Sequence, residues 1–289
     1  SLVGLEMCIR DRFKVSLRSD VYYLVRTSDE STDKIEGSVV WCKWTNHEIL
    51  VLLIKRILTY FGDSVDENTL MKTPQLHLRF HLERVMESTF SGRGKWENVY
   101  MYKILMSLIR KRPRDLVKLC SLAAQQAQQT NSPLIKTEHF QAIFEEYSQG
   151  RIQDTINEYK SELPNIENLL FGMRPTKKQR NASDGYIYTT AELIQKLNNI
   201  RQHTNFIFKN GRKASANELA QFLYKINFLT ARKIVESGEI QRKYFEENRY
   251  ISSSFVDFGY DWEVHPAFRW VLQPENINEI FNKLALSHD

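Results

Sequence analysis

The stretch Thr45-Asn46-His47-Glu48, followed by the apolar run Ile49–Phe61 and Gly62, decides the fold class of this chain. A Thr hydroxyl that accepts from a free backbone N–H, with a Glu three residues later that reaches back, forms a capping box and starts a helix. In the run that follows, apolar residues recur every three or four positions, and a glycine often ends such a pattern. The stretch therefore predicts an amphipathic helix from Thr45 to Gly62.

Similar signals predict further helices along the chain. Thr189–Glu192 and Ser215–Glu218 are two more capping boxes. Pro113 suits the first position of a helix, and Asp115 lies in its first turn, where the helix dipole favours an anion. The other segments with helical periodicity are Leu76–Met86, Glu97–Leu108, Thr137–Gly150, and 151–171 with a break at Pro164.

Short strands are expected in fewer places. Lys14–Arg18 and Ser38–Trp44 have the apolar and β-branched character of buried strands, and Tyr244–Asp261 fits two short strands. A last helix is expected from His265 to Leu272. The fold class is therefore mainly α with minor β. The order helix, helix, paired strands over residues 186–289 is that of a winged-helix domain.

Composition restricts the function classes. The 289 residues carry a formal net charge of +5, with 42% hydrophobic and 26% charged residues, which indicates a globular chain of two or three domains. The three cysteines Cys8, Cys42 and Cys120 are scattered and form no C-x-x-C, which favours a reducing compartment, the cytoplasm. We expect no membrane span, because no run approaches 18 apolar residues.

Two motifs invite catalytic interpretations that the sequence does not support. Ser91–Trp96 resembles a phosphate-binding loop, but such a loop needs a Gly at the position of Thr89 and a Ser or Thr at the position of Trp96. We therefore expect a flexible loop between helices. His77 and His81 are four residues apart, yet two ligands do not make a zinc site. We expect them to be partly buried or surface histidines, and the chain alone not to be an enzyme.

Arginines are the remaining candidates for ligand contact. Arg18 follows a predicted strand at the edge where open α/β sheets place their ligands. Arg112 and Arg114 flank a helix start, where the guanidinium forks suit phosphate oxygens. The alternative, which the sequence slightly favours, pairs Arg112 and Arg114 with carboxylates or neighbouring helices.

The charges of the predicted winged helix bear on nucleic-acid binding. Basic and acidic residues nearly balance over 215–226 and 239–249, whereas DNA readers concentrate Lys and Arg there. A protein-contacting winged helix is therefore preferred. The basic stretch Arg174–Arg180 is interpreted as a solvated linker, with a nucleic-acid-binding arm as the alternative.

Several stretches together resemble a known group of proteins. Residues 1–12 resemble a translated sequencing adapter, which implies that the natural protein is truncated just before Phe13. From about Phe13 to Leu284 the chain resembles bacterial P-loop ATPases of the STAND-like, AAA+-related signal-transduction group, often found in defence or signalling loci. The stretches that carry this likeness are Val15–Val21, Trp44 with the helix ending Ile54–Ile57, Arg112–Cys120, Tyr147-Ser148 and Val264–Arg269.

The resemblance implies a different role for each part of the chain. Residues 13–62 would be the C-terminal remnant of the nucleotide-binding core, 63–150 a helical lid bundle, 151–185 a connecting helix with a basic linker, and 186–289 the winged-helix domain. The lid and winged helix would regulate a switch that binds ATP and Mg²⁺ in the full-length parent. Both Walker motifs are missing, so no tight nucleotide binding is expected from this chain.

Residue roles and partners are implied in the same way. Arg18, Arg112, Arg114 and His265 would sense nucleotide in the full-length parent, although the simpler role of His265 is to cap its helix. The missing ATPase core would act in cis, with a protein partner or self-association and no membrane. Nucleic acid is a disfavoured partner. The alternatives are a winged-helix nucleic-acid-binding regulator and a nucleotide-independent protein-interaction module.

Overall fold

The computed structural model describes residues 38–40, 42–64, 66–177, 179, 185–234, 240–247 and 259–273. The chain divides into two compact units, residues 1–43 and 44–289, and only the second is described at length. The strand expected at Lys14–Arg18 lies outside the described residues. The described residues of Ser38–Trp44 form no strand, so that prediction is wrong for them: they pair with no described strand that could satisfy their backbone groups.

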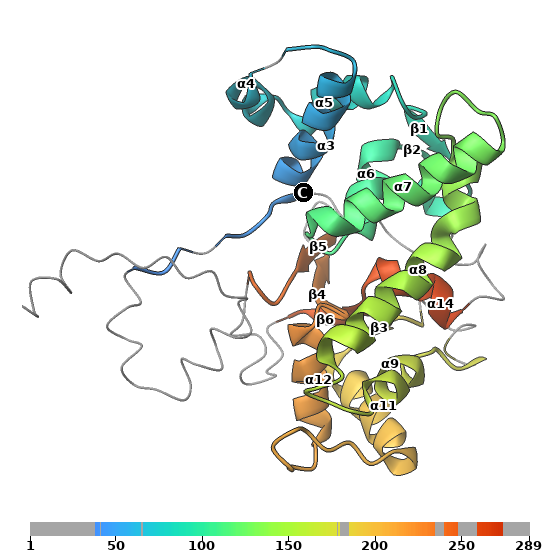
Figure 1. Ribbon diagram of the computed structural model, residues 1–289. Coiled ribbons are helices and arrows are strands. Elements are labelled where there is room, and N and C mark those ends of the chain that lie inside the picture. The colour runs from blue at the N-terminus through green and yellow to red at the C-terminus, as the bar shows by residue number, and fades with distance from the viewer. Residues whose placement is uncertain are drawn as a thin grey trace, which may run out of the picture. The chain divides into compact units, whose positions relative to one another are not determined.

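The first half of the large unit is mostly helical (Figure 1). Its helices are α3 Asn46–Tyr60, α4 Glu67–Lys72, α5 Gln75–Leu82, α6 Met101–Leu108, α7 Pro113–Gln129 and α8 Thr137–Tyr159. The Thr45–Glu48 capping box is confirmed, with both of its reciprocal hydrogen bonds present. Gly62, with φ of +77°, lies just beyond the end of α3. Pro113 occupies the first turn of α7 as predicted.

A small antiparallel hairpin interrupts these helices. It comprises β1 Thr89–Ser91 and β2 Glu97–Tyr100, joined through the 3₁₀ helix η2 Gly94–Trp96. The helix expected from Glu97 therefore begins at Met101, and the flexible loop expected at Ser91–Trp96 is wrong. The reason is the Trp96 side chain, which is fully buried against the Phe90 and Phe144 rings and holds the turn in place.

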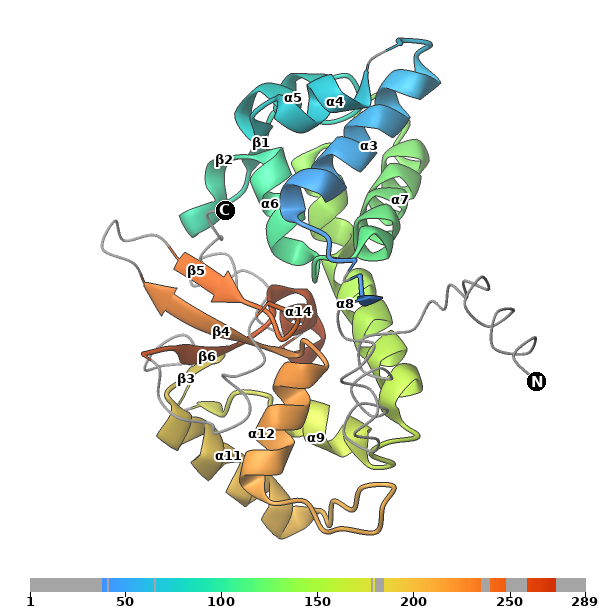
Figure 2. The same cartoon turned by 90° about the vertical axis from the view of Figure 1, so that its left-hand side faces the viewer.

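The helix α8 runs past Gly150, where the sequence pattern predicts its end. Its N-terminal half packs beside α7 and its C-terminal half approaches α9, as Figures 1 and 2 show. Beyond Gly150, the buried side chains Ile152, Ile156 and Tyr159 contact a second hydrophobic core. Packing therefore outweighs the modest cost of an internal glycine.

The second half contains a four-stranded antiparallel sheet, with helices α11 and α12 beside it (Figure 2). In chain order the elements are α9 Ile166–Gly172, β3 Ile187–Tyr188, α11 Thr190–His203, α12 Ala216–Lys225, β4 Leu229–Ile234, β5 Ile240–Lys243, β6 Asp261–Val264, the 3₁₀ helix η3 Pro266–Phe268 and α14 Arg269–Leu272. The strand order in the sheet is β3-β6-β4-β5. The capping boxes at Thr189 and Ser215 are both confirmed.

The strands of this sheet differ from the predicted positions. The sequence places two strands within Tyr244–Asp261, but β4 and β5 precede Tyr244 and β6 begins at Asp261. Residues 248–258 lie outside the described residues. β4 was missed because its sequence loses the apolar–polar alternation at the adjacent Arg232 and Lys233, and Arg232 is buried despite its charge.

Two hydrophobic cores fill the unit, and three elements, α8, η3 and α14, contribute to both. The first core lies among α3 to α7 and the N-terminal half of α8. The second lies among the rest of α8, α9, α11, α12 and the sheet. Trp270 of α14 enters the first core and stacks on Phe144, with ring centroids 4.6 Å apart, whereas Leu272 enters the second. α8 and α14 thus join the cores.

The fold class predicted from the sequence, mainly α with minor β, is confirmed. Among the described residues no helix combines the length and apolar character that crossing a membrane requires.

Candidate functional site

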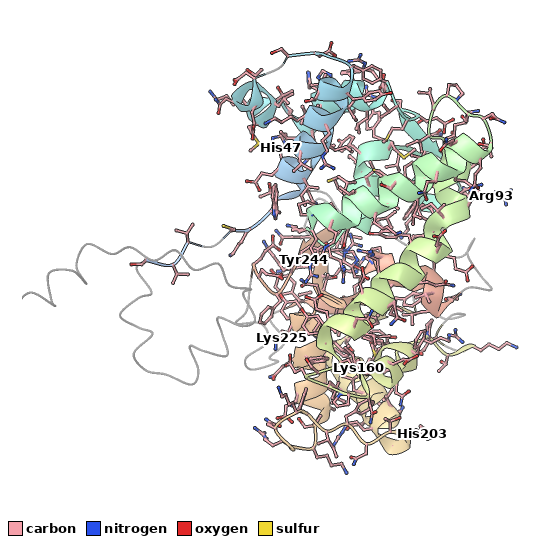
Figure 3. The ribbon with its side chains drawn as sticks, in the orientation of Figure 1. His47, Arg93, Lys160, His203, Lys225 and Tyr244 are labelled. Carbon is pink, nitrogen blue, oxygen red and sulfur yellow. The ribbon has the colours of Figure 1, made fainter. Side chains whose placement is uncertain are left out.

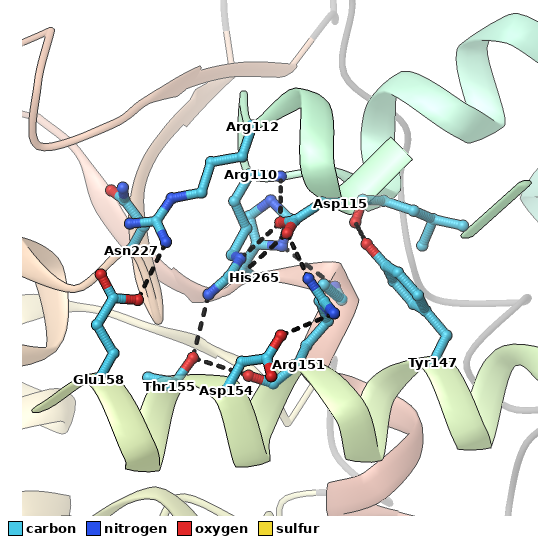
Figure 4. Close-up of polar contacts among 12 residues, drawn as sticks. Arg110, Arg112, Asp115, Tyr147, Arg151, Asp154, Thr155, Glu158, Asn227 and His265 are labelled. Atoms are coloured by element: carbon cyan, nitrogen blue, oxygen red, sulfur yellow. Dashed lines mark hydrogen bonds and ion pairs between the residues drawn. The ribbon is translucent and has the colours of Figure 1, made fainter. Parts of the chain in front are cut away.

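A buried carboxylate, Asp115, organises the polar contacts at the start of α7. Arg110 approaches it from the preceding loop, with its Nε 2.8 Å from Oδ2, and Arg151 of α8 places Nη1 2.5 Å from Oδ1 (Figure 4). Arg110 also donates to the Thr155 hydroxyl at 3.1 Å. We call Arg110, Asp115, Arg151 and Thr155 the Asp115 cluster. All four side chains are buried, so the cluster is sealed between α7 and α8.

The electrostatics of the Asp115 cluster favour the ionised pair. Burial works to raise the pKa of Asp115, but the neighbouring Arg110 and Arg151 outweigh it, and the pKa falls well below its usual range. For Arg110, burial works to lower the pKa, and the Asp115 carboxylate outweighs it and raises the pKa. The Asp115 cluster therefore stays ionised at neutral pH.

A second buried carboxylate, Glu263 of β6, lies on the polar face of the four-stranded sheet. Arg242 of β5 donates to it through Nε at 2.6 Å and Nη2 at 3.0 Å, and Arg269 of α14 donates through Nη2. Arg232 of β4 comes no closer than 3.9 Å. We call Arg232, Arg242, Glu263 and Arg269 the Glu263 cluster. Burial works to raise the pKa of Glu263, but Arg242 and Arg269 outweigh it and lower the pKa to about 2.

His265 lies between the two clusters. Its Nδ1 accepts from the backbone N–H of Ala267 at 3.1 Å, so the ring proton is on Nε2, which lies 3.2 Å from the Tyr244 hydroxyl. Burial, together with the positive charges of Arg110 and Arg242, lowers its pKa to about 3. His265 is therefore neutral and caps η3, the simpler of the two roles that the sequence suggests.

Contacts at Tyr244, labelled in Figure 3, connect the sheet to the loop before α7. Lys111 pairs with Glu247 at 2.6 Å and lies over the Tyr244 ring at 5.2 Å. Arg110 in turn lies over the Phe268 ring of η3 at 5.3 Å. Charged side chains from the loop before α7 thus contact residues of the second half.

The four residues proposed from the sequence have different surroundings. Arg18 lies outside the described residues. Arg112 pairs with Glu158 of α8 at 3.3 Å, as the alternative interpretation expects, whereas Arg114 is exposed on α7. His265 is completely buried. The structure brings Arg112 and His265 to the Asp115 cluster (Figure 4) but leaves Arg114 facing solvent.

The residues of the two clusters were missed by sequence reasoning. Arg110, Arg151, Arg232 and Arg242 are scattered along the chain, and nothing in their local pattern marks them as buried. Arg269 lies inside the Val264–Arg269 stretch that carried the resemblance, but without an assigned role. An arginine within a short strand, such as Arg232 within Leu229–Ile234, is the one local signal that could have been used.

Other sequence candidates contribute less. His77 is exposed on α5 and His81 half-buried, and no group of three or more metal-ligating side chains gathers within the described part of the chain. Arg174, at the start of the basic stretch, donates through Nε to the Leu272 carbonyl at 2.6 Å, so this end of the stretch is tethered to α14.

The arrangement of the two clusters suits ion pairing. Cys120 is half-buried, and its burial raises the pKa of its thiol to about 12, which disfavours the reactive thiolate. The neutral His265 has both ring nitrogens engaged. What the two clusters can do is hold the two cores in one arrangement, or release them when an ion pair is broken.

Comparison with known proteins matches one segment. Residues 75–156 match the family model of a FunZ-associated C-terminal helical domain. The matched segment runs from α5 into the C-terminal half of α8 and contains the whole Asp115 cluster. No curated protein and no solved structure matches the chain.

Proposed function

We propose that this chain is the regulatory lid and winged-helix portion of a P-loop ATPase switch, without Walker motifs and not catalytic alone. Nucleotide held by an ATPase core in cis would be sensed by the lid, and the change would be passed to the winged helix. The observation that carries the proposal is the coupling of the two cores by α8, α14 and the buried charge clusters. A relay needs two bodies and an element that reports the state of one to the other.

The order of elements in the second half supports the winged-helix assignment. In chain order the second half runs through helix α9, strand β3, helices α11 and α12, and then strands β4, β5 and β6. β3, β6 and β4 are adjacent in that order, and β5 adds a fourth strand at the edge. The family description of the first half, a C-terminal helical domain, is compatible with a lid that follows a larger core.

The proposed contacts with ATP and Mg²⁺ in the full-length parent rest mainly on Arg114. It is the exposed cation near the α7 start, where backbone N–H groups and the helix dipole favour phosphate. Arg112 would first have to leave Glu158, and His265 would have to be uncovered. We place the protein in the cytoplasm, with the ATPase core in cis and a protein partner or self-association.

Reading the gene upstream of the Phe13 codon tests the proposal. We expect a G-x-x-x-x-G-K-[ST] motif followed by an apolar strand that ends in Asp. In that gene product Arg114→Ala should lower the ATPase response, and Lys118→Ala, which removes an exposed charge one turn further along α7, should not. A gene without the motif, or equal activity of both variants, would contradict the corresponding part of the proposal.

Nucleic-acid binding is the second candidate, favoured by one observation. The loop between α11 and α12 carries three exposed cations, Lys209, Arg212 and Lys213. Arg212 also pairs with Glu218, which reduces the charge available to phosphates. A salt-sensitive gel shift of the whole chain, lost on replacing Lys209 and Lys213 by Gln, would favour this candidate over the ATPase switch.

A further inference from the structure

The Glu263 cluster contains more positive charge than its carboxylate can pair. Arg242 uses two nitrogens on Glu263, and Arg269 uses Nη2 on Glu263 and Nε on the Val264 carbonyl at 3.1 Å. Both oxygens of Glu263 are thereby engaged. Arg232, the third arginine, has only the 3.9 Å approach to Oε2.

The Arg232 guanidinium has no hydrogen bond to any residue that the structure describes. Its Nε is buried without a partner, and its side chain is 10% exposed, so one edge still meets solvent. Arg79 and Arg151 also have an unbonded Nε, but both bind a partner through Nη1. A buried donor without a partner costs about 1–3 kcal/mol, more when it is charged.

The strand register adds to this cost. Arg232 lies directly opposite Arg242 in the β4–β5 pair, and like charges in directly opposed positions destabilise a sheet. On the other side Arg232 faces Asp261 of β6, which is half-exposed and forms no ion pair with it in the described part of the chain. Among the described residues, Arg232 therefore faces a like charge on one neighbouring strand and has no carboxylate oxygen closer than 3.9 Å.

We propose that Arg232, with Arg242 beside it, binds a phosphate-type anion on this face of the sheet. A planar guanidinium matches two oxygens of a phosphate at once, and its charge-assisted hydrogen bonds are short and strong. A dianion supplies the negative charge that Arg232 meets only at 3.9 Å, on Glu263 Oε2. It also supplies acceptors to the Arg232 nitrogens that lack them.

The inference does not depend on the ATPase proposal, because it rests only on the Glu263 cluster. The phosphate group can belong to free inorganic phosphate or to a nucleotide, and both present the same oxygens to Arg232. The test therefore uses both as probes, inorganic phosphate and metal-free ATP. If the gene encodes no ATPase core upstream, the anion site can still be tested independently.

Calorimetric titration of the whole chain with each probe, at constant ionic strength in chloride, measures the binding. Arg232→Gln removes the unpaired fork, and we expect it to weaken affinity at least about tenfold, or 1.4 kcal/mol. Lys233→Gln is the matched control: it removes one charge from the next residue of β4, which is exposed and on the opposite face. Its affinity should stay within about twofold of the wild type.

Thermal unfolding provides a second readout that separates binding from a general salt effect. Phosphate stabilises many proteins by exclusion from their surfaces. A rise in Tm that all three proteins share therefore does not indicate a specific phosphate site. We expect a saturable rise in the wild type and in K233Q that R232Q lacks.

The outcomes decide the inference. Saturable binding that R232Q loses supports it, and the tighter of the two probes identifies the source of the phosphate group. Equal affinity of R232Q and K233Q for both probes, or no saturable binding by the wild type, overturns it. Because Arg232 makes no hydrogen bond in the described structure, R232Q should fold, which its melting transition without phosphate checks.

Discussion

The Asp115 and Glu263 clusters are built from the same residue types and differ in how far their charges are paired. Asp115 meets two arginines, and the second of these, Arg151, also pairs with Asp154 at 2.8 Å. Glu263 meets three arginines, of which Arg232 is held only at 3.9 Å. We call the first cluster closed, because both of its arginines are hydrogen-bonded, and the second open, because the Arg232 guanidinium has no hydrogen bond to a described residue.

The difference follows from the elements that carry the side chains. Around Asp115 the arginines come from a loop and a helix, so each reaches the carboxylate from its own direction. On the sheet, neighbouring strands fix Arg232 and Arg242 side by side with no freedom to separate. A closed cluster serves stability, and an open one is suited to bind something.

Removing the shared carboxylate of the open cluster should have the largest effect. Glu263→Gln removes the buried carboxylate that pairs with both Arg242 and Arg269, and breaking a buried ion pair costs about 3–5 kcal/mol. We expect the free energy of unfolding, measured by urea at pH 7, to fall by that amount. A loss under about 1 kcal/mol would mean that the cluster is solvated in solution.

The closed cluster should respond to the equivalent change by a somewhat smaller amount. Asp115→Asn leaves Arg110 with Thr155 and Arg151 with Asp154, so we expect a loss near 3 kcal/mol. Asp154→Asn is the control, since the Asp154 side chain is 53% exposed and its pair with Arg151 should contribute less than about 1 kcal/mol. Equal losses for the two variants would contradict the burial argument.

Acid should act on the molecule through His265. Its pKa is lowered to about 3 in the folded chain, while the unfolded chain takes up the proton near pH 6.5. Because the unfolded state then binds more protons, stability falls as the pH drops from about 6.5 toward 3, by about 1.4 kcal/mol per pH unit.

The variant His265→Asn isolates this contribution, because Asn can still accept from the Ala267 N–H at the start of η3 but does not titrate. Urea unfolding from pH 7 to 5 should show the slope in the wild type and a reduced slope in H265N. Below about pH 4.5 Glu263 adds its own loss: its ionised form is favoured on folding, and that stability disappears as the pH falls toward its pKa of about 2. Parallel profiles would show that His265 titrates normally.

The smallest expected change in stability is that of Arg232→Gln in the absence of phosphate, and it tests the difference between the two clusters most directly. Arg232→Gln should leave stability unchanged or raise it by up to about 1 kcal/mol, because it removes a like-charge neighbour of Arg242 and breaks no hydrogen bond. Denaturant midpoints in chloride buffer measure this. A clear loss of stability would show that Arg232 is paired in solution.

The local features of the fold could be predicted from the sequence. Helix starts at Thr45, Thr189 and Ser215 follow from capping boxes that involve residues three apart, and the start at Pro113 follows from the fixed backbone angle of proline. Boundaries set by distant packing could not be predicted, such as the continuation of α8 past Gly150 or the turn fixed by Trp96.

The candidate site was less accessible still. Arg110 and Thr155 are 45 residues apart, and Arg242 and Glu263 are 21 apart, on different elements. Burial of an arginine depends on where its partner carboxylate lies in space, and sequence spacing contains no record of that. Only Arg112 and His265, both next to a proline that starts a helical turn, were marked by their local pattern.

The helix α8 has a mechanical consequence. With 23 residues, it is a rod about 35 Å long, so a tilt of 10° about one end displaces the other by about 6 Å. Phe140 and Phe144 fix one end of this rod and Ile156 and Tyr159 the other. A small rotation of α8 at one core would therefore displace its side chains at the other core by more than a side-chain contact can absorb.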